Sequence, residues 1–297
     1  MLKKLADRLH LTLKHGQNLK IVTRLGLNYA QLVGLRVFKL FHGIRRPIVH
    51  YYAVCWNEEK MLPFMFDYYE QFVDKFTIYD NYSDDSSDVI IKQHPNAVVK
   101  KFSMDGQIND RVYQAIKNNC WKQSRGKADY VIVCDMDEFL YHPDVEATLQ
   151  RFSKAKVTLP TTEGYEMYSE AFPEYEKGML LTDKVQLGVR SRWLDKSIFF
   201  DPHRIVDINF AIGAHRAEPT GIVRRNDGVP FKVLHYKHLG LDYLMERYRK
   251  LGERLSDYNR TNKFGTHYLA KEVELRAEME QGLFNACNII FDNKTNI

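Results

Sequence analysis

Residues 131–140 read VIVCDMDEFL and place an acidic cluster directly after a strand-like run. The run VIVC is rich in β-branched residues, which is typical of a buried β-strand. Asp135, Asp137 and Glu138 follow it at once. Carboxylates this close together destabilise a fold unless a cation or a shared proton compensates their charge. The cluster therefore predicts a chemical role at the end of this strand.

The composition of the chain is that of a globular protein. It has 297 residues, 44% of them apolar, which suits one large α/β domain or two small ones. We find no run of eighteen uncharged apolar residues and no secretory signal at the N-terminus. The four cysteines form no C-x-x-C pair, so we expect buried free thiols. These features predict a cytoplasmic protein.

Strand and helix patterns alternate through the first half of the chain. The strand-like runs are VHYYAVCW from residue 49, DKFTIYD from 74, AVVKKFS from 97 and ADYVIVCD from 128. Helical patterns lie between them, PFMFDYYEQF from residue 63 and QINDRVYQAIKNNCWKQSRG from 107. The alternation predicts an α/β fold with a Rossmann-like, mostly parallel sheet flanked by helices. In such sheets the ligand site lies beyond the carboxyl ends of the strands.

Polar side chains follow three of the predicted strands. Asn57 and Glu58 come after the first strand, Asp80 and Asn81 after the second, and the acidic cluster after the fourth. The carboxyl ends of parallel strands meet at one edge of the sheet, so we expect these groups to share one site.

The pair Asp135 and Asp137 has the spacing of a metal site. In an extended segment alternate side chains lie on the same side, so the two carboxylates would face one point. Such oxygens suit Mg²⁺ or Mn²⁺, which also take oxygens from a diphosphate. The alternative is a pair of solvated loop acids.

The positive charge of the chain is concentrated at its N-terminus. The first 50 residues hold ten Lys and Arg against one acid, Asp7, so their net charge is +9, and the total of +5 leaves −4 for the rest. Apolar residues recur at near-helical spacing among basic ones in LKKLADRLHLTLKH and AQLVGLRVFKLFHGIRRP, so we expect a basic amphipathic helical segment over residues 1–47. Such a segment could lie on an anionic membrane surface or pack on the core. No nucleic-acid-binding motif accompanies the charge, so we expect no nucleic-acid partner.

An ordered set of motifs carries a resemblance to a known family. The set comprises WNEEKMLPFMFDYYEQFVDKFTIYDNYSDDSSD, CDMDEFL, KSIFFDPHRI, GAH and LHY, in this order. It resembles the metal-dependent GT-A glycosyltransferases, and most closely the family 2-like group and the related family 92. The resemblance spans residues 49 to about 249. The resemblance implies a GT-A catalytic domain (48–240), and the charge and helix patterns outside it predict a basic amphipathic helical segment (1–47) and C-terminal helices packed on that domain (241–297).

The resemblance also implies roles for individual residues. His235 of LHY matches a histidine that closes over the diphosphate and can bind the metal ion, Mn²⁺ or Mg²⁺. The alternative for this residue is a structural histidine. The implied metal ligands are Asp135, Asp137 and His235. The implied nucleotide contacts are Asn57, Glu58, Asp80, Asn81, Asp135 and Lys196.

The catalytic base has several candidates. An inverting transferase needs a carboxylate that takes the proton of the acceptor hydroxyl. Four acids lie in the region expected to form the acceptor pocket: Glu163, Glu166, Glu170 and Asp195. We favour Glu170, because EGYEMYSEAFP predicts a strand that leaves into a loop at the site, and Asp195 is the next candidate.

The function predicted from these features is transfer of a sugar from a nucleotide-sugar, with UDP favoured, to a hydroxyl of a glycan or lipid-linked acceptor. Cell-surface polysaccharide synthesis is the expected context, and the enzyme would be cytoplasmic or peripheral at the inner face of the membrane. A sugar-phosphate nucleotidyltransferase is one alternative, although WNEEKMLP lacks the glycines of a phosphate loop. A non-enzymatic scaffold at a membrane surface is the other.

Overall fold

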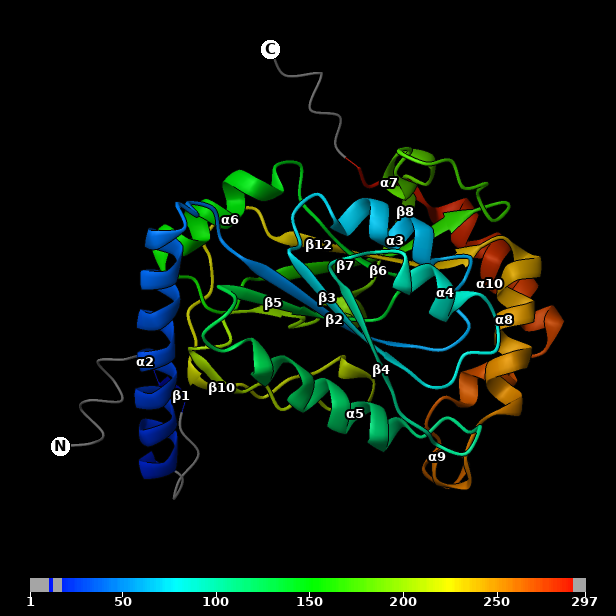
Figure 1. The fold of residues 1–297 in the computed structure, drawn as a ribbon. Helices are drawn as coiled ribbons and strands as arrows, with labels where there is room; N and C mark the ends of the chain where they lie inside the picture. Colours follow the sequence, from blue (N-terminus) through cyan, green and yellow to red (C-terminus); the bar gives the residue numbers. More distant parts are fainter. Residues whose placement is uncertain (1–10, 13–17, 291–297) are drawn as a thin grey trace, which may run out of the picture.

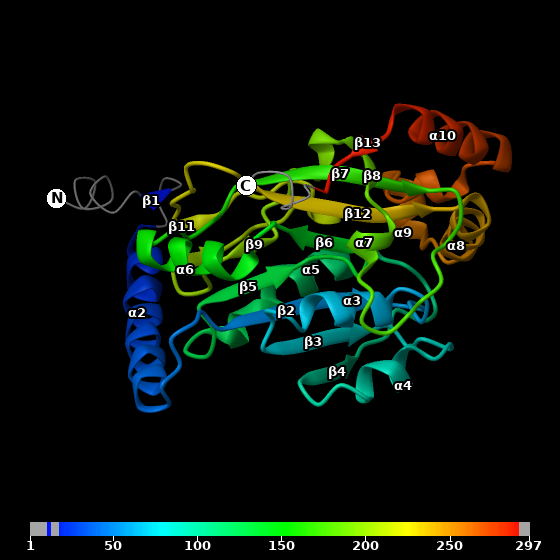
Figure 2. The same cartoon turned by 90° about the horizontal axis from the view of Figure 1, so that it is seen from above.

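The computed structural model describes residues 11–12 and 18–290. Two five-stranded sheets form the centre of the molecule, and helices cover their outer faces and ends (Figure 1). Figure 2, turned by 90°, shows the same layers from above, with α2 at one end and α8 at the other. The predicted α/β class, with a parallel-rich sheet flanked by helices, is confirmed.

The first sheet is the predicted parallel sheet, with the order β4-β3-β2-β5-β9. Strand β2 pairs in parallel with β3 on one side and β5 on the other, and β3 pairs in parallel with β4. Strand β9 closes the sheet antiparallel to β5. The strands are β2 (Val49–Cys55), β3 (Lys75–Asp80), β4 (Ala97–Lys101), β5 (Tyr130–Val133) and β9 (Phe199–Phe200).

The second sheet was not predicted from the sequence. Its order is β13-β8-β7-β12-β6, and only the central pair β7 and β12 is parallel. Strand β6 begins at Glu138, so the acidic cluster forms the turn between the two sheets. The strands are β6 (Glu138–Tyr141), β7 (Thr162–Ser169), β8 (Leu187–Arg190), β12 (Phe231–Leu239) and β13 (Cys287–Asn288). A third, small sheet comprises β1 (Leu11–Thr12), β11 (Thr220–Ile222) and β10 (Ile205–Asp207).

The helices between the parallel strands lie where the sequence predicted them. Helix α3 has Pro63 in its first turn, where proline removes no helical hydrogen bond. The long predicted helix at residues 107–126 is shorter in the structure, because α5 passes into a 3₁₀ turn at Cys120 and the chain turns at Gly126 with a φ of 77°. The helices of this region are α3 (Leu62–Tyr69), α4 (Ser87–Lys92), α5 (Asp110–Asn119), η1 (Cys120–Ser124) and α6 (Val145–Ala155).

Further helices lie before the first sheet and after strand β12. Helix α2 (Asn18–Phe41) precedes the first sheet, and α8 (Leu241–Glu253) follows β12, as predicted from residue 241 onward. The segment LKKLADRLHLTLKH lies outside the described residues apart from Leu11–Thr12. The remaining helices are α7 (Leu181–Lys184), η2 (Arg192–Leu194), η3 (Ile212–Ala214), α9 (Asp257–Asn262), η4 (Thr266–Leu269) and α10 (Glu272–Asn285).

The main core lies between the parallel sheet, α3 and the second sheet. It is rich in aromatic rings, such as Tyr51, Tyr69 and Phe139, and all three are fully buried. The hydroxyl of Tyr69 donates to the carbonyl of Glu138 at 2.8 Å and accepts from the amide of Leu140 at 2.8 Å. These bonds fix the start of β6 against α3, and with it the acidic turn that precedes β6.

Two further expectations can be compared with the described residues. No helix among them is long and apolar enough to cross a membrane. All four cysteines are free, and Cys55, Cys120 and Cys134 are buried as predicted. Cys287 is exposed instead, because it lies on the short edge strand β13.

A buried histidine on β2 makes stability depend on pH. His50 Nδ1 lies 2.8 Å from Ser124 Oγ, and burial, aided by the positive charge of Lys75, lowers the pKa of His50 to about 4. The unfolded chain binds a proton near pH 6.5 and the folded chain does not. The free energy of unfolding should therefore fall by about 2 kcal/mol as the pH drops from 6.5 to 4.

Urea unfolding of the His50→Phe variant at pH 7 and pH 4.5 checks this expectation. The variant should lose less stability than the parent over this range, because the group that titrates differently is gone. His42 is exposed, so His42→Phe is the matched control and should keep the parent's pH dependence. An equal loss in the parent and in His50→Phe would contradict the prediction.

Candidate functional site

Three strand ends of the parallel sheet meet at one rim. Cys55, the last residue of β2, lies in register with Asp80 of β3, and the amide of Asn81 donates to the Cys55 carbonyl at 2.9 Å. Arg247 of α8 contacts both Glu58, after β2, and Asp137, after β5. The polar groups that follow these strands are thus brought together as the sequence predicted.

The acidic residues after β5 form a turn rather than an extended segment. The amide of Glu138 donates to the carbonyl of Asp135 at 3.1 Å, and Met136 between the two aspartates is buried. The side chains of Asp135 and Asp137 therefore have different partners, contrary to the expectation that they face one point. The Asp135 side chain is 40% exposed, whereas that of Asp137 is 5% exposed.

Asp137 faces His235 of strand β12. His235 Nε2 lies 3.6 Å from Asp137 Oδ2, and its Nδ1 lies 2.8 Å from Glu166 Oε2 on β7. Burial alone would lower the pKa of His235, but Glu166 and Asp137 outweigh it and raise that pKa to about 10. Burial would likewise raise the pKa of Asp137, but His235 and Arg247 hold it well below its usual range. Glu166 therefore fixes the ring so that Nε2 faces the carboxylate of Asp137.

Arg247 provides a second cation at Asp137. Its Nη2 lies 3.3 Å from Asp137 Oδ2 and its Nη1 lies 2.8 Å from Glu58 Oε1. Burial raises the pKa of Glu58 to about 7, although Arg247 counteracts this effect. The guanidinium thus links α8 to the turns after β2 and β5.

Two buried lysines compensate the other two carboxylates of the cluster. Lys117 of α5 places Nζ 2.6 Å from Asp135 Oδ1, and Lys196 forms an ion pair with Glu138. Burial would lower the pKa of Lys117, but Asp135 and Glu138 raise it above its usual value. Lys196 was predicted as a phosphate contact, and the structure shows it buried against Glu138.

Two of the predicted nucleotide contacts, Asn57 after β2 and Asp80 at the end of β3, are bound to other side chains of the protein. Asn57 has a φ of 53°, and its side chain donates to Asp84 and accepts from the Asp84 amide at 3.0 Å. Asp80 is fully buried and pairs with Lys101, and its carboxylate also accepts from Ser83. The loop after β3 is therefore held rigidly against the turn after β2.

The two candidate bases occupy different surroundings. Glu170 is exposed directly after β7, next to Ser169, whose carbonyl accepts from the amide of Gly240 at 3.0 Å. Asp195 accepts from the amide of Gly164 at 2.9 Å and pairs with Arg190 at 2.8 Å. Glu170 is therefore free of a structural task among the described residues, whereas Asp195 holds the start of β7 to β8.

Three residues of this site were not assigned their observed contacts from the sequence. Glu166 was predicted only as a candidate base, and no contact with the acidic cluster was predicted for Arg247. Lys117 was not considered at all. A lysine or arginine on an amphipathic helix gives no signal of its own for burial, because the partner that compensates its charge comes from another element.

The donor set allows a divalent cation between Asp137 and His235. Two ligands of one Mn²⁺ or Mg²⁺ ion lie about 3 Å apart in octahedral geometry, close to the 3.6 Å between Oδ2 and Nε2. Residues 11–12 and 18–290 contain no group of three or more His, Cys, Asp or Glu side chains arranged to hold a metal. A cation here would therefore need oxygens from water or from a diphosphate as its other ligands.

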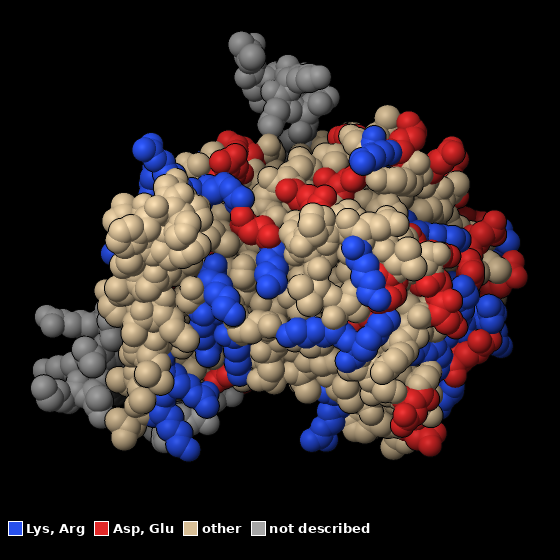
Figure 3. All heavy atoms as spheres, in the orientation of Figure 1, with Lys and Arg blue, Asp and Glu red and all other residues tan. Residues whose placement is uncertain are grey.

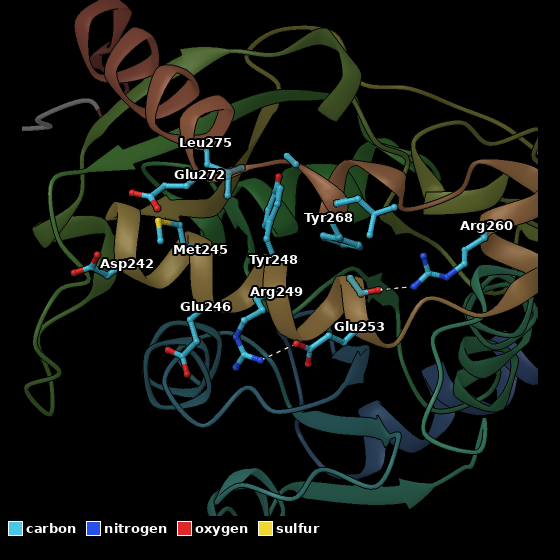
Figure 4. Close-up of a pocket in the computed structure, with 13 residues that line it drawn as sticks. Asp242, Met245, Glu246, Tyr248, Arg249, Glu253, Arg260, Tyr268, Glu272 and Leu275 are labelled. Carbon is cyan, nitrogen blue, oxygen red and sulfur yellow. Dashed lines mark hydrogen bonds and ion pairs between the residues drawn. The ribbon is translucent and has the colours of Figure 1, made fainter.

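Two cavities adjoin this region on either side of α8. A small one of about 80 Å³ lies between α8 and the turn after β2, where Glu58 and Arg247 line it. A larger, open one of about 680 Å³ lies between α8, η4 and α10 (Figure 4). The rings of Tyr248 and Tyr268 meet there edge to face, with centroids 5.4 Å apart. Carboxylates from α8, such as Glu246 and Glu253, stand at its edge.

Comparisons with known proteins give distant structural likenesses. Neither a protein-family model nor a curated protein sequence matches the chain. Among solved structures, S. aureus TarS is similar at 11% identity and a TM-score of 0.40, over 77% of this chain and 43% of that chain. TarS 1–349 in complex with UDP-GlcNAc gives 10% identity and a TM-score of 0.40, over 78% of this chain and 73% of that chain.

A structure of GalNAc-T7 with UDP, GalNAc and Mn²⁺ is also similar, at 10% identity and a TM-score of 0.30. It covers 41% of this chain and 23% of that chain. The match to the first TarS structure spans less than half of the TarS chain. Identities and TM-scores this low carry no functional conclusion for this chain.

Proposed function

We propose that this chain is a metal-dependent glycosyltransferase that moves a sugar from a nucleotide-sugar donor to an acceptor hydroxyl. The observation that carries the proposal is the pair Asp137 Oδ2 and His235 Nε2, 3.6 Å apart at the rim where parallel strands end. Glu166 behind the histidine orients the ring as it would for a metal ligand. Mn²⁺ or Mg²⁺ bound there would supply charge that stabilises a departing nucleoside diphosphate.

The cations around the site support the same chemistry. Lys117 holds Asp135 ionised, and Arg247 does the same for Asp137. Both place fixed positive charge beside the position where a diphosphate would gain negative charge. The exposed side of Asp135 is available to a ribose hydroxyl, with Asn57, Glu58, Asp80 and Asn81 in the surrounding turns. Lys196 would attract the phosphates electrostatically without contacting them, because its ammonium group is paired with Glu138.

The finer parts of the proposal come from the sequence motifs. We propose a UDP-sugar as donor and a hydroxyl of a glycan or lipid-linked carrier as acceptor, in the synthesis of a cell-surface polysaccharide. The assignment to the family 2-like or family 92 enzymes belongs to this proposal, as do a cytoplasmic location and the three-part division at residues 47 and 240.

Titration calorimetry with UDP, GDP and CMP tests the proposed function. Each nucleotide is added to the purified chain in about 1 mM Mn²⁺, a large excess over the protein, and again in excess EDTA. We expect UDP to bind in Mn²⁺ and to lose most of its affinity in EDTA. Binding of GDP or CMP in place of UDP would correct the donor class. No metal-dependent binding of any of the three by folded protein would overturn the proposal.

Substitution of the candidate bases tests the acceptor side. Glu170→Gln should lower kcat for transfer about 100-fold with little change in the KM for the donor, because a general base acts only in the transition state. Asp195→Asn should instead lower the thermal midpoint, because it weakens the ion pair with Arg190. Steady-state kinetics and thermal unfolding of both variants measure these effects. Full activity of Glu170→Gln would exclude Glu170 as the base.

A further inference from the structure

Helix α2 packs on the protein through one narrow face. Its buried residues are Ile21, Asn28, Leu32 and Leu35, which recur at helical spacing. Leu35 contacts a small apolar cluster with Ile48, and the side chain of Asn28 donates to the carbonyl of His203 at 3.1 Å. This face holds the helix to the body of the molecule and leaves the rest of its circumference outside.

The opposite face of α2 is also apolar, and it is exposed. Leu27 is 65% exposed, Leu40 is 81% exposed and Phe41 is 82% exposed. Small residues, including Gly26, Ala30 and Gly34, lie between the large ones. The other exposed large apolar side chains of the helix are Leu19, Tyr29, Val33, Val37 and Phe38. A continuous apolar face along a helix of about 36 Å is unusual for a surface in contact with water only.

Basic residues border this face, and acids are absent from it. The sequence has no Asp or Glu from residue 8 to residue 57. Lys20, Arg36 and Arg45 make no ion pair within the described residues, whereas Arg24 and Lys39 pair with aspartates of the body. Figure 3 shows a largely uncharged strip over α2, bordered by Lys and Arg side chains. An apolar face flanked by cations complements an anionic lipid surface.

The position of α2 leaves the candidate site accessible. Helices α2 and α8 lie at opposite ends of the molecule in both views (Figures 1 and 2), and α8 carries Arg247 of the site. A surface that covers the outer face of α2 would therefore not obstruct the rim where the strands end.

We propose that α2 is a membrane-docking helix that lies flat on an anionic bilayer, with Leu27, Leu40 and Phe41 in the headgroup boundary and Lys20 and Arg36 on lipid phosphates. This inference goes beyond the proposed function and rests on the helix alone. It would also place the transfer site on the side away from the bilayer, so that a membrane-anchored acceptor must extend past the body of the protein to reach it.

Flotation with vesicles tests this proposal on the full chain. The probes are vesicles of phosphatidylcholine alone and vesicles in which about 30% of the lipid is anionic phosphatidylglycerol. We expect at least tenfold more protein on the anionic vesicles, and weaker binding as the salt concentration rises. Leu27→Glu/Phe41→Glu should lose this binding, because two charges enter the apolar face.

A matched variant controls for charge. Val273→Glu/Phe284→Glu adds the same two charges on α10, where Val273 is 69% exposed and Phe284 is 87% exposed. This variant should bind like the parent. Circular dichroism checks that both variants stay folded. Equal binding of the two variants, or no binding of the parent to anionic vesicles, would overturn the proposal. A parent dimer that Leu27→Glu/Phe41→Glu dissociates, without vesicle binding, would also overturn it and assign the face to a second copy of the chain.

Discussion

Replacing Asp137 with Asn is expected to abolish metal-dependent binding of UDP. The change removes one of the two protein ligands proposed for the cation, so the affinity for UDP in Mn²⁺ should fall at least about 100-fold. Transfer should fall about 10³-fold, because the charge that stabilises the leaving diphosphate is lost with the cation. Titration calorimetry and an assay of released UDP measure the two effects.

The fold should survive this change, which keeps the test specific. Without the Asp137 carboxylate, His235 keeps Glu166 as a partner and Arg247 keeps Glu58. Glu166→Gln is the graded control, because it leaves both proposed ligands and removes the negative charge that orients His235 and also contacts His238. It should weaken UDP binding about tenfold. If Asp137→Asn bound UDP as tightly as the parent in Mn²⁺, the assignment of Asp137 as a ligand would be wrong.

Replacing Arg247 with Met is expected to destabilise the protein by about 3–5 kcal/mol, the range for removal of one partner from a buried ion pair. The side chain of Glu58 is 9% exposed, and Arg247 is its only ion-pair partner among the described residues. Without Arg247, Glu58 must either stay charged in a buried place or take up a proton above its ordinary pKa. Urea unfolding at pH 8, where the carboxylate is ionised, measures the loss.

The double variant Arg247→Met/Glu58→Gln separates this effect from simple loss of packing. Neutralising both partners removes the unpaired charge, so most of the lost stability should return. Glu58→Gln alone should cost less than Arg247→Met, because Arg247 retains Asp137 as a partner. Additive losses in the double variant would show that the charge pair is not what Arg247 contributes.

The first half of the fold could be predicted because its signals are local. Each parallel strand is a short apolar run with a polar end, and each helix between strands has a regular apolar face, as in β2 and α5. The second sheet could not be predicted in the same way. The paired residues of its strands β7 and β12, such as Thr162 and Phe231, are about 70 positions apart in sequence and meet only through contacts that the tertiary fold creates.

The candidate site could likewise be predicted from the sequence only in part. The polar strand ends could be predicted to meet, because parallel topology brings them to one rim. The turn at Asp135 to Asp137 could not, since an alternating pattern does not show where the chain leaves one sheet for another. The contacts of Lys117 and Arg247 with the cluster were not predicted, because these two residues lie on α5 and α8, elements separate from the acidic turn.

A crystal structure of the full chain with Mn²⁺ and UDP tests the central claim most directly. The anomalous signal of manganese locates the ion independently of its ligands. We predict one manganese ion bonded to Asp137 Oδ2, His235 Nε2 and oxygens of the UDP diphosphate, with the ribose near Asp135. The claim would be contradicted if manganese and UDP bound elsewhere in the molecule while Asp137 kept only its ion pairs with His235 and Arg247.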